Sequence, residues 1–225
     1  EIGGQKFSDF KGDLFFKDNR LVVEKFLFDV LGGSLTGNLF LVQKPGGPML
    51  TFTTQFSGLD FSGLIQPTGK TAAPGEDAIV NGNAQIEFQV TQGVGEGSVS
   101  LDQISIKTAI TRIGGETLDK VLLYLDPEES KPAIVDTRAK LKLASPHKIL
   151  ISLENGNLNV QAWLKNKVLG NIIQAPELKR VPVASLKQFD RISGPLQAVG
   201  RINNILKYLS ARGLTFDEEG NPILF

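Results

Sequence analysis

The sequence predicts a mainly β protein: an elongated antiparallel β-meander curled into an apolar groove, with helices at about 116–126 and 194–212. Three observations lead to this prediction. Apolar and polar residues alternate along several runs, turn residues separate the runs, and only two segments show helical spacing. At 225 residues the chain is long enough for one large domain. We expect residues 1–225 to form this single domain, as a fragment of a longer membrane-anchored protein.

The alternating runs lie at 50–56, 84–91, 138–143 and 157–164. On a strand, side chains two residues apart point to the same side, so each run is expected to have one dry and one wet face. Antiparallel sheets commonly have this division. The apolar positions that we expect to line the groove and bind an apolar ligand are Leu50, Phe52, Phe56, Ile86, Phe88, Val90, Leu141, Leu143, Leu158 and Val160.

Turn residues agree with a meander. Asn155-Gly156 is the strongest hairpin signal, because both central residues of the turn need positive φ. Asp18-Asn19, Gly32-Gly33 and Pro45–Pro48 separate further pairs of runs, and residues 66–77, rich in Pro, Gly and Ala, predict a loop.

A short motif, glycine followed by Asp or Asn and then an apolar residue four positions after the glycine, recurs at irregular intervals. We interpret it as a shared way of opening a strand. Its copies start at Gly12, Gly37, Gly82 and Gly156.

Two segments depart from the alternation. Apolar residues recur every three or four positions from Leu118 to Leu125, and Pro127 ends the pattern, which predicts the first helix. The same spacing from Val199 to Leu209 predicts the second.

Composition argues against several classes of function. Lys and Arg together number 24, as do Asp and Glu, so no net field attracts nucleic acid. The absence of cysteine excludes disulfides, thiol nucleophiles and cysteine-ligated metals, and fits an envelope protein. No run of about 18 apolar residues is present to cross a membrane.

Catalytic motifs are also missing, so we expect no enzyme, no cofactor and no metal. The single histidine, His147, lies in Ser145-Pro146-His147-Lys148, which predicts an exposed turn. Gly69-Lys70-Thr71 resembles a phosphate-binding loop, but its spacing is wrong and Pro74 replaces the required helix.

Several motifs between about residues 10 and 190 resemble the C-terminal region of the AsmA-like family of envelope proteins, whose relatives include YdbH, YhdP and TamB. They are Gly12-Asp13-Leu14, Arg20–Val23, Leu31–Gly37, Phe56–Asp60, Asn81-Gly82, Ile110–Gly115, Leu125-Asp126-Pro127 and Asn155–Leu158. The resemblance implies an elongated β-groove in the periplasm of a Gram-negative bacterium, anchored in the inner membrane through a segment absent here. It offers no catalytic residues.

The resemblance and the alternation together predict a non-enzymatic lipid-binding or lipid-transfer domain that supports outer-membrane biogenesis or integrity. Its expected partners are phospholipid or another apolar ligand, the inner or outer membrane, and envelope proteins, but not nucleic acid. The alternative is a structural or assembly factor for outer-membrane proteins, whose apolar face serves only as core. A hydrolase, the third possibility, has no supporting residues. The first two differ in whether the apolar stripes exceed what two short helices can cover.

Overall fold

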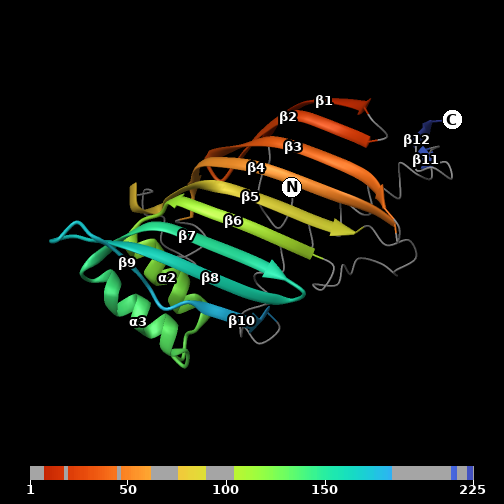
Figure 1. The fold of residues 1–225 in the computed structure, drawn as a ribbon. Coiled ribbons are helices and arrows are strands. Elements are labelled where there is room, and N and C mark those ends of the chain that lie inside the picture. The colour runs from red at the N-terminus through yellow and green to blue at the C-terminus, as the bar shows by residue number, and fades with distance from the viewer. Residues whose placement is uncertain are drawn as a thin grey trace.

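A computed structural model describes residues 8–17, 20–44, 47–61, 76–89, 104–183, 214–216 and 222–224. One large antiparallel sheet dominates it and two helices lie at one end, so the predicted mainly β class is confirmed (Figure 1). The sheet has ten strands and is not closed into a barrel.

Strands that follow one another in the chain lie side by side, in the order β1-β2-β3-β4-β5-β6-β7-β8-β10, and β9 also pairs with β8. The strand bounds are β1 Ser8–Lys17, β2 Arg20–Val30, β3 Gly33–Lys44, β4 Gly47–Asp60, β5 Ile79–Gln89, β6 Ile104–Arg112, β7 Ala144–Glu154, β8 Asn157–Asn166, β9 Ile172–Gln174 and β10 Leu178–Pro182. Two short strands, β11 Leu214–Phe216 and β12 Pro222–Leu224, pair with each other.

Tight turns set the register of the meander. Asn155 and Gly156 have φ of 50° and 69°, so the predicted primed turn joins β7 to β8. The predicted glycine turn between β2 and β3 falls one residue earlier, at Leu31-Gly32, again with two positive φ values. The turns predicted at Asp18-Asn19 and Pro45-Gly46 lie outside the described residues, as does most of the predicted loop at 66–77. The last two residues of this predicted loop, Glu76 and Asp77, belong to the short helix η1, Glu76–Ala78.

The first predicted helix is confirmed as α2, Gly115–Leu125, and the second, at 194–212, lies outside the described part of the chain. The strand predicted at 138–143 is wrong, because a helix, α3, runs over Pro132–Leu141. Pro132 suits the first turn of a helix, where its missing N–H leaves no hydrogen bond broken. Ile134, Thr137 and Leu141 are the buried residues of this helix, and their spacing of three and four is helical.

Three of the motif glycines lie within strands and do not open them. Gly12, Gly37 and Gly82 are interior to β1, β3 and β5. A Cβ on Gly37 would lie 2.9 Å from Cζ of Phe26, its opposite residue on β2. A Cβ on Gly82 would lie 2.5 Å from Cζ of Phe56, its opposite residue on β4. A Cβ would lie even closer to a backbone oxygen, that of Thr53 at Gly37 and that of Ala109 at Gly82, so these glycines make room for neighbouring backbone as well as for the phenyl rings.

Asp126, at the end of α2, holds the turn between the two helices. Its carboxylate accepts hydrogen bonds from Oγ of Ser130 and from the backbone N–H of Lys131, both at 2.7 Å. Burial alone would raise the pKa of Asp126, but these hydrogen bonds and the charge of Lys131 outweigh burial and lower it. The buried carboxylate is therefore stabilised as an anion.

Candidate functional site: the apolar face of the sheet

Cross-strand register gathers many apolar residues of β2 to β8 on one side of the sheet. One row crosses the strands from β3 to β6, and each of its residues pairs with the next: Leu41, Leu50, Phe88 and Ile104. The neighbouring row carries Leu39, Phe52, Ile86 and Ile106, and continues to Leu153 and Leu158. We call this side the apolar face.

Helices α2 and α3 cover one end of the apolar face, near β6 to β8 (Figure 1). Leu118 and Leu122 of α2 and Ile134 of α3 pack in one cluster with Ile149 and Leu164 of the sheet. This end of the face is therefore a closed core.

The rest of the apolar face extends beyond that cluster. A second cluster of buried residues comes from the strands β2 to β6 alone: Leu21, Leu41, Leu50, Phe88 and Ile104. Against it pack Leu39, Ile86 and Ile106, which remain partly exposed. The apolar face thus continues across β2 to β6. Within the described residues, the cluster there contains no residue of a helix.

Aromatic rings and small residues shape the middle of this region. The ring of Phe26 stacks on Phe52 with centroids 4.9 Å apart and 10° between the planes. Next to them, Thr54, Ala84 and Thr108 are opposite one another in register on β4, β5 and β6. Ala84 and Thr108 are partly exposed. Small side chains thus occupy the row next to the one that carries Phe52, Ile86 and Ile106.

From β4 to β8 the opposite face of the sheet is mainly polar, whereas at β2 and β3 it also carries Val22, Phe40 and Val42. Thr53, Gln85, Lys107, Ser152 and Asn159 form its central row. Lys107 pairs there with Glu154 at 3.3 Å. The sheet is therefore amphipathic, and an apolar ligand would favour only one of its faces.

The structure places seven of the ten predicted ligand-contacting residues on the apolar face. They are Leu50, Phe52, Phe56, Ile86, Phe88, Leu158 and Val160. Leu141 is buried, but as part of helix α3 within the closed core. Leu143 follows α3 and is 70% exposed, away from that core. Val90 lies outside the described residues.

The sequence analysis missed several residues of the face. Ile104, Ile106 and Ile110 alternate with polar residues, so the same rule would have found them. Phe26 could not be found this way, because a bulge at Lys25, which has φ of 51°, interrupts the alternation of β2.

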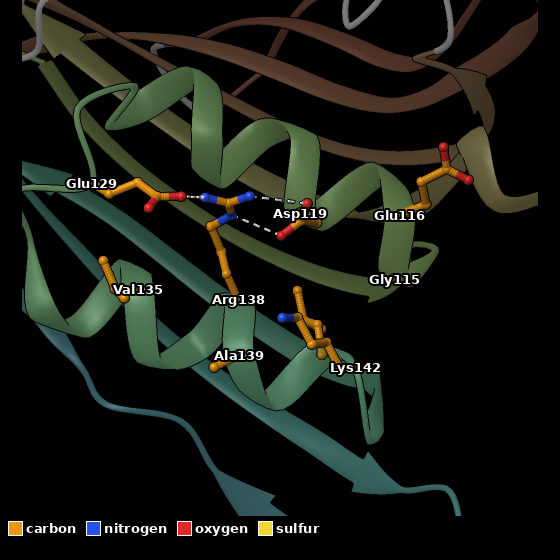
Figure 2. Close-up of a pocket in the computed structure, with 9 residues that line it drawn as sticks. Gly115, Glu116, Asp119, Glu129, Val135, Arg138, Ala139 and Lys142 are labelled. Carbon is orange, nitrogen blue, oxygen red and sulfur yellow. Dashed lines mark hydrogen bonds and ion pairs between the residues drawn. The ribbon is translucent and has the colours of Figure 1, made fainter.

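A separate pocket of 390 Å³ lies between α2 and α3, and its chemistry is ionic (Figure 2). Figure 2 shows the guanidinium of Arg138 between the carboxylates of Asp119 and Glu129. Nε of Arg138 donates to Asp119 at 2.7 Å, and this hydrogen bond is the main cause that raises the pKa of Arg138. Since two carboxylates already saturate the guanidinium, we interpret this pocket as a clamp between the helices.

His147 is exposed, as predicted, but it lies within β7 and not in a turn. In the described ranges, no group of three or more His, Cys, Asp or Glu residues could hold a metal ion. No helix among the same residues is long and apolar enough to span a membrane.

Comparison with known proteins identifies no relative: no family model, no curated protein and no solved structure matches the chain.

Proposed function

We propose that this protein is a non-enzymatic lipid-binding or lipid-transfer domain whose apolar face holds acyl chains. The observation that carries the proposal is the extent of that face, which continues across β2 to β6 beyond the cluster covered by α2 and α3. The second cluster itself is buried, but Leu39, Ile86 and Ile106 beside it remain partly exposed, and these side chains are the contacts that we propose for an acyl chain.

The partly exposed side chains in the middle of the apolar face suit an acyl chain. Phe52, Ile86 and Ile106 flank the small residues Ala84 and Thr108, and none of these five is fully buried. Each methylene of an acyl chain gains about 0.8 kcal/mol on leaving water, so eight methylenes would supply about 6 kcal/mol before the costs of binding. That gain requires no specific contact with the lipid head group.

The resemblance to AsmA-like proteins agrees with this proposal and extends it. On that basis we propose a periplasmic location in a Gram-negative bacterium and a role in supplying phospholipid to the outer membrane.

Organic extracts of the purified protein, analysed by mass spectrometry, test the proposal directly. We expect phospholipid in the extract of the wild type. Ala84→Trp would cover the partly exposed middle of the apolar face without adding a charge, and we expect a folded protein depleted of phospholipid. Ala109→Trp is the matched control, because Ala109 lies on the polar face one strand away; its lipid content should equal that of the wild type.

Two results would contradict the proposal. One is wild-type protein that neither carries phospholipid nor takes it up from vesicles. The other is Ala84→Trp protein that is folded and retains as much phospholipid as the Ala109→Trp control.

A further inference from the structure

Exposed apolar side chains gather where β8 turns into β9. Of the six large apolar residues that are exposed in the described ranges, four belong to this place. They are Leu143 at 70%, Val168 at 87%, Leu169 at 75% and Ile172 at 52% exposure, and we call them the apolar tip. The backbone N–H of Lys167 donates to the carbonyl of Leu143 at 3.0 Å, which brings the end of α3 against the turn. In Figure 1 this turn projects beyond the ends of the neighbouring strands.

The turn supplies partners for several of its own backbone N–H groups. The side-chain oxygen of Asn166 accepts hydrogen bonds from the N–H groups of Val168 at 2.8 Å and Leu169 at 2.9 Å. The carbonyl of Asn166 accepts the N–H of Gly170 at 3.0 Å, and its N–H donates to the carbonyl of Asn171 at 2.9 Å. These N–H groups therefore need no water, and the tip can enter an apolar environment at a reduced desolvation cost.

Lysines lie close to the apolar tip along the chain and on the adjoining strands β7 and β8. Lys142, Lys148, Lys165 and Lys167 are all exposed, and none has an acidic partner within 4 Å among the described residues. The stretches 137–153 and 155–176 contain no Asp or Glu, although the whole chain has 24 acidic and 24 basic residues. The charge is thus segregated toward this end of the sheet.

We propose that the apolar tip docks on the surface of an anionic phospholipid bilayer. Val168 and Leu169 enter the boundary between head groups and acyl chains, while the lysines lie among the phosphates. An apolar tip with lysines close to it provides both contributions that interfacial binding requires, buried apolar area and attraction to anionic lipids. The inference does not depend on a lipid bound to the apolar face.

Flotation with vesicles of equal parts phosphatidylglycerol and phosphatidylcholine tests the docking. We expect the wild type to float with these vesicles, and to float less as salt rises, because the lysine contribution is screened. Val168→Ser combined with Leu169→Ser should weaken partitioning by about tenfold, because it removes the apolar contribution. Val135→Ser, a change at a 39% exposed position on α3, is the apolar control and should bind like the wild type.

A second pair of variants tests the charge. Lys165→Gln with Lys167→Gln should lower partitioning onto anionic vesicles and not onto pure phosphatidylcholine. Lys11→Gln with Lys44→Gln removes the same charge from exposed positions on β1 and β3 and should have no effect.

Leu169→Trp in a Trp163→Phe background reports insertion directly, because the chain has one tryptophan. We expect a blue shift of its emission on addition of anionic vesicles. Absence of that shift, or equal flotation of the double serine variant and the wild type, would overturn the proposal and leave the apolar tip as a contact for protein. The apolar-face variant Ala84→Trp should float normally, so failure of the lipid-binding proposal is separable from failure of this one.

Discussion

Two substitutions on β5, each introducing a carboxylate, can distinguish a buried position of the apolar face from an accessible one. Phe88 and Ile86 lie two residues apart on the same strand and on the same face. Phe88 is 2% exposed within the cluster that includes Leu50 and Ile104, whereas Ile86 is only partly buried against that cluster. Phe88→Asp and Ile86→Asp therefore make the same chemical change in two different environments.

The two substitutions should differ in their effect on the free energy of unfolding. Loss of a buried phenyl ring alone costs about 3–5 kcal/mol. An unpaired buried carboxylate adds several kcal/mol, and natural domains are stable by only about 5–15 kcal/mol. We expect Phe88→Asp to unfold the domain. At Ile86 the carboxylate reaches water, so the loss should be about 2 kcal/mol, the lower limit for truncating a buried isoleucine. For a chain of this length that lowers the unfolding midpoint by about 4–8 °C.

Thermal unfolding and phospholipid content, measured on the same preparations, provide the comparison. We expect Phe88→Asp to show no cooperative transition, and Ile86→Asp to melt cooperatively with little bound phospholipid. The reasoning is refuted if Phe88→Asp keeps the wild-type midpoint, or if Ile86→Asp is as unstable as Phe88→Asp.

Three further predictions concern stability. Gly156→Val should lower the free energy of unfolding by about 1 kcal/mol or more, since Gly156 has φ of 69° in the hairpin turn; an unchanged denaturant midpoint would contradict this. Asp126→Asn should destabilise the wild-type fold at pH 7 and much less in acid. Folding lowers the pKa of Asp126, so its anion contributes stability above its ordinary pKa of about 3.9, and that contribution falls as the pH drops through the folded value; urea unfolding at pH 7 and pH 3 measures the difference. Arg138→Met should cost about 1–3 kcal/mol by leaving Asp119 without its cation, and equal stability in chemical denaturation would show that the clamp contributes nothing.

Local sequence determined several strands of the sheet and the hairpin between β7 and β8. Alternation at 50–56, 84–89 and 157–164 predicted β4, β5 and β8, because a strand places every second residue on the same side. Asn155-Gly156 predicted the β7–β8 turn, because few other residue pairs adopt two positive φ values at low cost. The face of each strand followed from the same pattern, so most of the apolar face could be inferred from the chain alone.

Tertiary structure decided the secondary structure of residues 138–143, where the alternation of a strand competes with the spacing of a helix. Ala139, Leu141 and Leu143 alternate like a strand, yet Ile134, Thr137 and Leu141 form a buried helical stripe. Only Leu141 belongs to both patterns, since Ala139 and Leu143 are exposed, and packing of α3 on the sheet selects the helix.

The exposure of Leu143, Val168 and Leu169 was likewise invisible in the sequence, because hydrophobicity alone predicts burial. Their exposure depends on how the turn after β8 meets the end of α3 in the folded chain. The fold also brings lysines from β7 and β8 close to them.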